Sequence, residues 1–223
     1  MILSESGLKL TGKVRVRHLL DVLSVDVGAQ LIANAVLKKG FVQDGNSVNV
    51  RCTNVNGGNE SKSFNANASN EHSVKESNHV KKCFDGFTFA PYYGCQCLRP
   101  YSVFDDPELP CSMEPLIKAT GAKIHSWSMG AKCCGASHIN TDPDVSLNLV
   151  KAILMNAKGA DAIITVCPMC HMNLEAYQEK ISSMCHEELK IPVLYLPQLI
   201  GLAMGMSNKD VRLDLNLSVP LNF

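Results

Sequence analysis

The apolar positions of this chain change period repeatedly from Asp85 onward. Short apolar runs, as expected of buried strands, alternate with patterns of helical period. The predicted strands are Phe87–Ala90, Ile124–Trp127, Ala162–Val166 and Ile191–Leu196, and the predicted helices between and after them are 112–120, 142–158, 171–184 and 197–204. Strands that alternate with helices predict an α/β fold, a small parallel sheet flanked by helices.

The helix that follows Asp142 is the most clearly marked element. Asp142 can cap the free backbone N–H groups, Pro143 suits the first helical position, and Gly159 follows the last turn. One apolar stripe runs along it, formed by Leu147, Val150, Leu154 and Ala157. This spacing predicts that one face of the helix is buried.

The pattern also divides the chain. Lys13–Arg17 alternates as a short strand, and apolar residues then recur at helical spacing from Leu19 to Val36. Residues 40–84 are rich in Asn, Ser, Gly and Lys and show neither period. We therefore expect a strand and helices in 1–39, an inserted and largely disordered linker in 40–84, an ordered domain in 85–205 and a tail in 206–223.

Composition narrows the setting. Lys plus Arg and Asp plus Glu are both 21, so the charge favours neither nucleic acid nor an anionic membrane surface. The N-terminus has no long apolar segment typical of a secretory signal, and no run approaches about 18 consecutive apolar residues. We expect a cytoplasmic protein with no membrane insertion. Ten cysteines in such a chain indicate metal chemistry rather than disulfides.

Five of these cysteines follow predicted strands. Cys95 follows the first strand, the adjacent pair Cys133–Cys134 the second, and Cys167 with Cys170 the third. Loops at the carboxyl ends of parallel strands share one edge of the sheet. The topology therefore predicts that these cysteines meet at this edge.

Three kinds of site remain open for the five thiols. A polynuclear iron-sulfur centre can use both sulfurs of an adjacent pair and two more from a C-x-x-C turn. A structural zinc site would need four thiolates and leave one idle. The third alternative is that the cysteines pack as small buried hydrophobes.

The motifs resemble a known family. Tyr92-Tyr93-Gly94-Cys95 with Leu98-Arg99-Pro100, then Gly130-x-x-Cys133-Cys134-Gly135, then Cys167-Pro168-x-Cys170-His171-Met172-Asn173-Leu174 resemble the second cysteine-rich CCG domain of the heterodisulfide reductase B subunit, over about residues 85–205. The segment from Gly12 to Leu20 is similar to the one that joins the two halves of that subunit.

The resemblance implies a non-cubane [4Fe-4S] cluster held by Cys95, Cys133, Cys134, Cys167 and Cys170. It implies the reduction of a small disulfide of the CoM-S-S-CoB type to two thiols, a reaction of methanogenesis. The implied partners are the ferredoxin-like iron-sulfur C subunit and the flavin-bearing A subunit of the same complex.

The chain also departs from that family. It carries one CCG domain where the family subunit carries two, and a long segment where the family has a short connection. A truncated copy, a split subunit with a separate N-terminal half, and a single-cluster relative all fit the pattern. A non-catalytic zinc or electron-transfer scaffold, and the iron-sulfur subunit of another CCG-type oxidoreductase acting on glycolate, lactate or succinate, are the alternatives.

Other residues are candidates for roles beside the five cysteines. His171 and His138 could protonate a leaving thiolate or simply lie at exposed helix starts, and Arg99 could bind an anionic substrate group or pair with Asp105 or Asp106. Gly94 and Gly135 are expected to allow positive φ or close approach to the metal centre. Expected to stand apart from the site are Cys97, Cys111, Cys185, Cys52, Cys83, His72 and His79.

Overall fold

The computed structural model describes residues 18–37, 84–99 and 105–218. Its centre is a four-stranded sheet of β1 (Thr88–Tyr92), β2 (Lys123–Ile124), β3 (Ala162–Thr165) and β4 (Val193–Tyr195). The order is β2-β1-β3-β4 and every pair is parallel, which confirms the predicted α/β class. The predicted strand Lys13–Arg17, the interior of the predicted linker, Cys52, Cys83, His72 and His79 lie outside the described residues.

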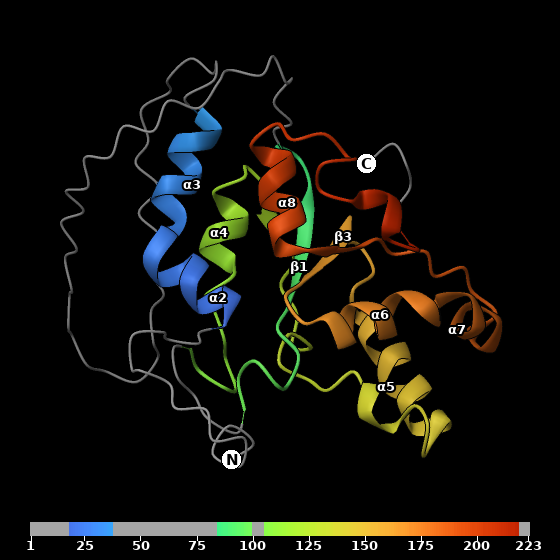
Figure 1. Cartoon of the computed structure of the whole chain (residues 1–223). Coiled ribbons are helices and arrows are strands. Elements are labelled where there is room, and N and C mark those ends of the chain that lie inside the picture. The colour runs from blue at the N-terminus through green and yellow to red at the C-terminus, as the bar shows by residue number, and fades with distance from the viewer. Residues whose placement is uncertain (1–17, 38–83, 100–104, 219–223) are drawn as a thin grey trace, which may run out of the picture.

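Helices cover both faces of this sheet (Figure 1). One group comprises α2 (Leu19–Asp21), the π-helical turn η1 (Val22–Val27), α3 (Gly28–Leu37), α4 (Glu114–Lys118) and α8 (Leu196–Ala203). The other comprises the 3-10 turn η2 (Ala136–His138), α5 (Pro143–Asn156), α6 (Pro168–Ala176) and α7 (Gln178–Cys185). A further 3-10 turn, η3 (Leu213–Leu215), lies near the C-terminus.

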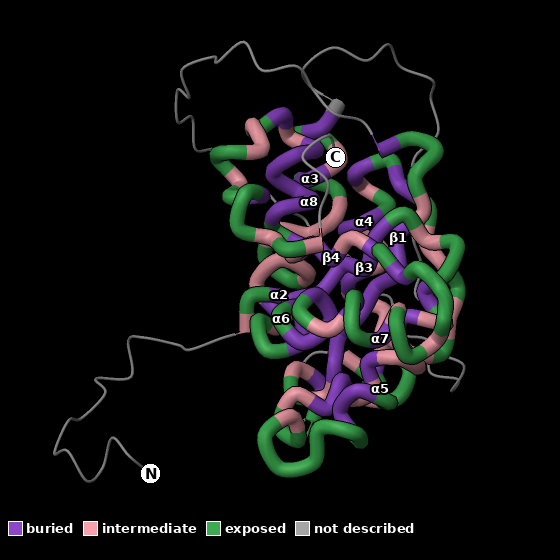
Figure 2. Tube along the Cα trace, turned by 90° about the vertical axis from the view of Figure 1, so that its right-hand side faces the viewer, coloured by how far each residue is buried: buried purple, intermediate pink, exposed green. Residues whose placement is uncertain are grey.

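Successive strand residues supply two separate apolar cores. Phe89 of β1 and Ile164 of β3 pack with α3, α4 and α8, whereas Ala90 and Ile163 pack with α5, α6 and α7. This is the alternation expected of a sheet buried on both faces. Figure 2 shows the strands buried at the centre of the molecule and the exposed segments around them.

Strand β1 was predicted to stop before Pro91, and this prediction was wrong. The amides of Lys123 and His125 donate to alternate carbonyls on one side of β1. Pro91 is the next residue on that side, but β2 has already ended at Ile124. The missing N–H of the proline therefore faces no partner strand, and its carbonyl accepts from Trp127 Nε1 at 3.0 Å.

Other bounds also differ from prediction: α4 and β4 are shorter than predicted, and two further differences have a structural consequence. Strand β2 covers only Lys123–Ile124 instead of Ile124–Trp127. The predicted helix 171–184 starts at Pro168 and is broken at Tyr177, where ψ is 5°. The break lets the Gln178 amide exchange two hydrogen bonds with the backbone of Ile191, of 2.7 and 2.8 Å. This pairing fixes the chain just before β4.

Helix α5 confirms its predicted start and stripe. The Asp142 carboxylate accepts from the Val145 amide at 3.2 Å, and all four stripe residues are buried. Phe84, which falls at the end of the predicted linker, is 3% exposed and lies in the core beside α4, so the ordered domain includes it.

The first described helices form an apolar segment. Leu20 and Ile32 are fully buried against the sheet core, whereas Leu19, Val25 and Leu31 are exposed. Leu19–Val36 is long and apolar enough to cross a membrane, with a mean hydropathy of 1.5, and 11% of it is buried. Core helices of soluble proteins and N-terminal signal sequences satisfy the same criterion.

Leu154 tests the second core. Leu154→Ala should lower the free energy of unfolding by about 3 kcal/mol, because it leaves a cavity at a fully buried position. Val145→Ala on the same helix, where the side chain is 43% exposed, should cost less than about 1 kcal/mol. Urea unfolding followed by circular dichroism measures both, and equal costs would contradict the burial of this stripe.

Candidate metal centre

The five cysteines that follow strands lie at one edge of the sheet. Cys95 follows β1, Cys133 and Cys134 follow β2, and Cys167 with Cys170 follow β3. These three strands are neighbours in the sheet, with β1 in the middle. Their loops therefore adjoin at the carboxyl ends of the strands, as the topology predicted.

The sulfur atoms approach one another in pairs. Cys95 Sγ lies 3.7 Å from Cys133 Sγ, and Cys134 Sγ lies 3.5 Å from Cys170 Sγ. The Cys167 thiol is also hydrogen-bonded to Cys170. Cys134 and Cys170 are buried and the other three are half-buried. Over the described ranges, no three His, Cys, Asp or Glu side chains are grouped so as to hold one metal ion.

Two glycines permit these approaches. Gly94 has φ +68°, and a Cβ there would lie 2.7 Å from Cys170 Sγ. Gly135 has φ +76°, and a Cβ there would lie 2.9 Å from Cα of Ser146 on α5. Both positions need positive φ, as predicted. Only Gly94 is pressed against a cysteine sulfur, whereas Gly135 lets the cysteine pair pack on a helix.

Local hydrogen bonds favour the thiolate of two cysteines. The Cys170 thiol and the backbone N–H groups of Met169 and Cys170, at the start of α6, lower the pKa of Cys167 to about 5 against the opposing effect of burial. The hydrogen bond between Cys134 and Cys170 likewise lowers the pKa of Cys134 to about 7. The thiolate is the form that binds metals.

Two further thiols of the group are held neutral in the metal-free protein. Hydrogen bonds to Cys134 and Cys167 raise the pKa of Cys170, and burial adds to that effect. Burial and the Cys133 thiol raise the pKa of Cys95. Close negative charges repel one another where burial keeps water away, so proton loss from all five thiols requires a cation.

Two side chains that were not predicted as site residues bond to the loop that carries Cys133 and Cys134. Tyr92 is fully buried and donates to the carbonyl of Lys132 at 2.7 Å. Its pKa is raised by burial and then by the neighbouring cysteines, Cys170 first. Asn173 Nδ2 donates to the carbonyl of Cys134 at 2.8 Å. Both residues lie within the motifs, but the sequence pattern carries no sign that they contact the cysteine loops.

Comparison with known proteins agrees with this arrangement. Residues 89–175 match the family described as "CCG: Cysteine-rich domain". This stretch is similar to CCG domains. It includes all five cysteines and, except for Thr88 at the start of β1, the three strands that they follow.

Curated relatives extend the likeness. The chain is 32% identical over 142 residues to the 8-methylmenaquinol:fumarate reductase membrane anchor subunit of Wolinella succinogenes, covering 62% of this chain and 50% of that protein. It is 36% identical over 146 residues to a protein of Archaeoglobus profundus described as like the B subunit of heterodisulfide reductase, covering 62% and 48%.

A third relative is the B subunit of the ferredoxin:CoB-CoM heterodisulfide reductase of Methanosarcina mazei, 31% identical over 140 residues, covering 60% and 47%. The resemblance to the heterodisulfide reductase B subunit is therefore confirmed. The chain spans about half the length of the curated relatives that it matches.

A crystal structure of a hypothetical protein from Helicobacter pylori has the same fold. The two superpose with a TM-score of 0.51 at 18% identity, covering 67% of this chain and 28% of that one. At this identity the match concerns the fold alone.

His171 does not lie at an exposed helix start, which was one of the two positions considered for it. His171 is 6% exposed. Its Nδ1 lies 3.3 Å from Glu175 Oε2 and its Nε2 lies 3.2 Å from Asn216 Nδ2. The ring stacks on Tyr195 with 4.0 Å between centroids. Burial lowers the pKa of the imidazole, although Glu175 opposes this. Both ring nitrogens are therefore engaged within a buried polar cluster.

His138 and Arg99 lie at the surface. His138 is exposed at the end of η2. Arg99 Nη2 lies 2.5 Å from Glu108 Oε1, so its ion pair is with Glu108 rather than with Asp105 or Asp106. The Asp105 carboxylate instead accepts from backbone amides.

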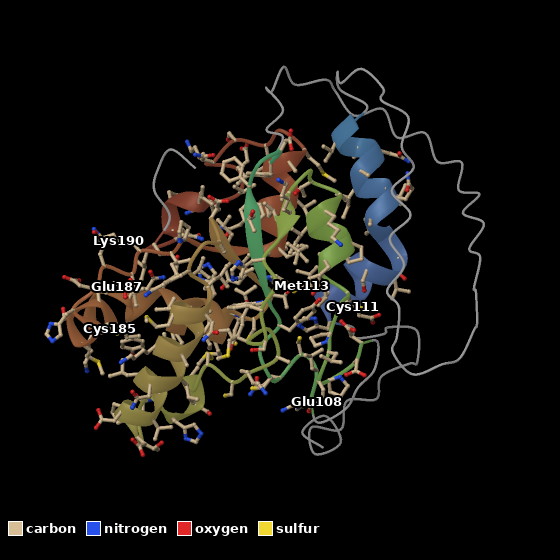
Figure 3. The ribbon with its side chains drawn as sticks, turned by 180° about the vertical axis from the view of Figure 1, so that it is seen from behind. Glu108, Cys111, Met113, Cys185, Glu187 and Lys190 are labelled. Atoms are coloured by element: carbon tan, nitrogen blue, oxygen red, sulfur yellow. The ribbon has the colours of Figure 1, made fainter. Side chains whose placement is uncertain are left out.

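The three described cysteines expected to stand apart are placed separately. Cys97 Sγ donates to the carbonyl of Tyr93 at 3.2 Å, and burial raises its pKa to about 12. Cys111 and Cys185 are half-buried. Figure 3 labels both and shows them far apart in this view.

The donor set fits an iron-sulfur cluster. Five buried or half-buried thiols come from three adjoining loops, two of them have lowered pKa values, and Gly94 leaves room beside Cys170 that a side chain would fill. Cys95, Cys133, Cys134, Cys167 and Cys170 would hold the cluster. When bound, it would supply electron transfer.

Gly94→Ala tests the close approach. The added Cβ meets Cys170 Sγ and should lower the iron bound per chain by at least about tenfold, because it displaces a ligand. Gly159→Ala is the matched control, since Gly159 also has positive φ but an added Cβ there would meet nothing within 4 Å. It should cost about 1 kcal/mol of stability and no iron. Equal iron loss in both variants would contradict the steric explanation.

The pKa of Cys167 predicts a pH profile. In the metal-free protein, alkylation of Cys167 by iodoacetamide should proceed at nearly full rate from about pH 6 to 8 and fall only below about pH 5, because the thiolate is the nucleophile. Peptide mapping by mass spectrometry measures the rate. Cys97, with a pKa of about 12, should remain slow throughout this range. A Cys167 rate that rises about tenfold per pH unit up to pH 8 would contradict the lowered pKa.

Proposed function

We propose that this chain is the iron-sulfur subunit of a heterodisulfide reductase-like complex. The observation that carries the proposal is the close approach of cysteine sulfurs from three loops at one sheet edge, Cys95 to Cys133 and Cys134 to Cys170. The matched CCG domain and the relatives among heterodisulfide reductase B subunits support the same interpretation. We further propose that the cluster is a non-cubane [4Fe-4S] cluster.

The proposed substrate is a small disulfide of the CoM-S-S-CoB type. Two electrons and two protons convert such a disulfide into two thiols, with cleavage of the S–S bond. The proposed electron donors are a ferredoxin-like iron-sulfur C subunit and a flavin-bearing A subunit, and a separate N-terminal half would supply a second CCG domain. Cys95, Cys133 and Cys167 are half-buried and would be the thiols most accessible to a substrate.

Other residues of the chain would exclude water from the cysteine site and hold its ligands in place. Tyr92 and Leu174 are fully buried in the same apolar core as Cys134 and Cys170, which excludes water and strengthens electrostatic interactions. Asn173 fixes the carbonyl of Cys134, and the amides at the start of α6 face Cys167. Such contacts around the ligands tune metal affinity and potential.

A second function is favoured by one specific comparison. The Wolinella relative is a fumarate reductase membrane anchor subunit, which suggests an iron-sulfur subunit that exchanges electrons between a quinol and a dicarboxylate enzyme. The two functions differ in their partners. Purification from the native host would yield heterodisulfide reductase subunits for the first, and a flavoprotein that oxidises succinate for the second.

We also propose a cytoplasmic location and a domain division at the linker, residues 40–84. Fractionation of native cells tests the location. Recovery of the chain in the membrane fraction would favour the second function and direct attention to Leu19–Val36.

Metal analysis tests the cluster itself. Anaerobically purified protein should contain about four irons and about four acid-labile sulfides per chain, and should give an EPR signal after oxidation. Cys134→Ser should lose most of this iron, because it removes a buried ligand. Cys185→Ser, which changes a half-buried thiol at the end of α7, should keep it.

Two results would contradict the proposal. Stoichiometric zinc without sulfide would leave a structural zinc scaffold. Full bleaching by Cys52→Ser or Cys185→Ser would mean that the ligands extend beyond the five cysteines named.

A further inference from the structure

Glu175 is a carboxylate buried in the wall behind the C-x-x-C loop. It lies on α6, five positions after Cys170, and is 7% exposed. A buried carboxylate needs hydrogen-bond donors, because loss of water is costly for a charged group. Its donors come from a segment more than forty residues further along the chain.

This segment is the C-terminal strap, defined as Asn216–Ser218. The amide of Leu217 donates to Glu175 Oε2 at 3.1 Å. The amide and hydroxyl of Ser218 donate to Glu175 Oε1 at 3.1 and 2.7 Å. All three donors therefore converge on one carboxylate, in the charge-assisted form that makes such bonds strong.

The strap also covers the outer edge of β4. Ser218 Oγ accepts from the amide of Val193 at 3.0 Å, and Asn216 Nδ2 donates to the carbonyl of the same residue at 2.9 Å. Side chains thus take the place of a further strand at this edge. The strap is held by β4 on one side and by α6 on the other.

His171 links the strap to the part of α6 that carries Cys170. It follows Cys170 directly, and its ring lies between Glu175 and Asn216 while it stacks on Tyr195 of β4. Displacement of the ring would break these contacts with the strap and with β4. Helix α6, which begins after Cys167 and contains Cys170, is therefore tied to β4 through the strap.

We propose that Glu175 is a positioning residue, which uses the C-terminal strap to hold α6 so that the sulfurs of Cys167 and Cys170 stay in place. Loss of its donors or of its charge would leave buried polar groups unpaired and loosen the first turns of α6. The inference rests on the proposed cluster for its iron measurement. Its thiol measurement requires only the cysteines.

Glu175→Gln in the full-length chain tests the proposal. The amide group that replaces one carboxylate oxygen opposes the strap donors. In the metal-free protein, alkylation of Cys170 by iodoacetamide, which is slow because this thiol is 4% exposed, should become about tenfold faster. In the iron-loaded protein, iron loss to a chelator should also become about tenfold faster, and the EPR line shape should change.

Glu179→Gln is the matched control, because it makes the same chemical change one turn later on an exposed residue. It should leave both rates within about twofold of the wild type. Ser218→Ala removes one donor to Glu175 and should give a smaller increase, of about threefold. This variant carries the test if Glu175→Gln does not fold.

The outcomes separate the two proposals. Wild-type alkylation and iron loss in both Glu175→Gln and Ser218→Ala would overturn the positioning role. Faster Cys170 alkylation in a chain that never binds iron would support the positioning role while overturning the iron-sulfur function. Equal acceleration in Glu179→Gln would also overturn the role assigned to Glu175.

Discussion

The parallel pairing of β1 with two neighbours is the constraint on which the rest of this structure depends. Because β1 lies between β2 and β3, and all three run in the same direction, three loops distant in sequence end side by side. A parallel sheet must be covered on both faces, so helices pack on each side and leave the strand ends open. The cysteines lie at the edge where the fold presents backbone turns to a ligand.

That placement brings thiols closer together than thiolates tolerate without a cation. Cys167 and Cys134 gain lowered pKa values from hydrogen bonds, while Cys170, which bonds to both, is kept protonated. A bound metal centre would replace these protons, as is usual for thiolate ligands. Repulsion between neighbouring thiolates destabilises the metal-free site when all five cysteines are deprotonated. The same repulsion therefore favours the binding of a cationic cofactor.

Residues that follow the CCG motif in the sequence also support the cysteine site. The residues after α8 return to the sheet, where Leu213 enters the core and the strap bonds to β4 and Glu175. The domain thus extends past its matched residues 89–175. A buried carboxylate satisfied by a distant segment makes folding of the tail and of α6 interdependent.

Much of the fold and of the site could be predicted because it depends on local chemistry. Asp142 and Pro143 specify a helix start whatever surrounds them, and the spacing of Leu147, Val150 and Leu154 specifies its buried face. The strand-to-cysteine order of the chain, combined with the parallel topology that it implies, also predicted that the loops of the five cysteines would adjoin.

Other features were decided by tertiary contacts. Pro91 continues β1 because β2 has ended beside it, and α6 breaks from α7 because Gln178 bonds to Ile191, partners that no local pattern reveals. The burial of His171 depends on a tail whose sequence has weak periodicity.

The amino-acid sequence by itself determined the class of fold and which thiols lie at the same sheet edge. Both follow from the periodicity of the apolar residues and from the order of strands and cysteines along the chain. Only the tertiary structure decided which polar side chains hold those thiols in position, because hydrogen bonds across forty residues depend on the packed fold.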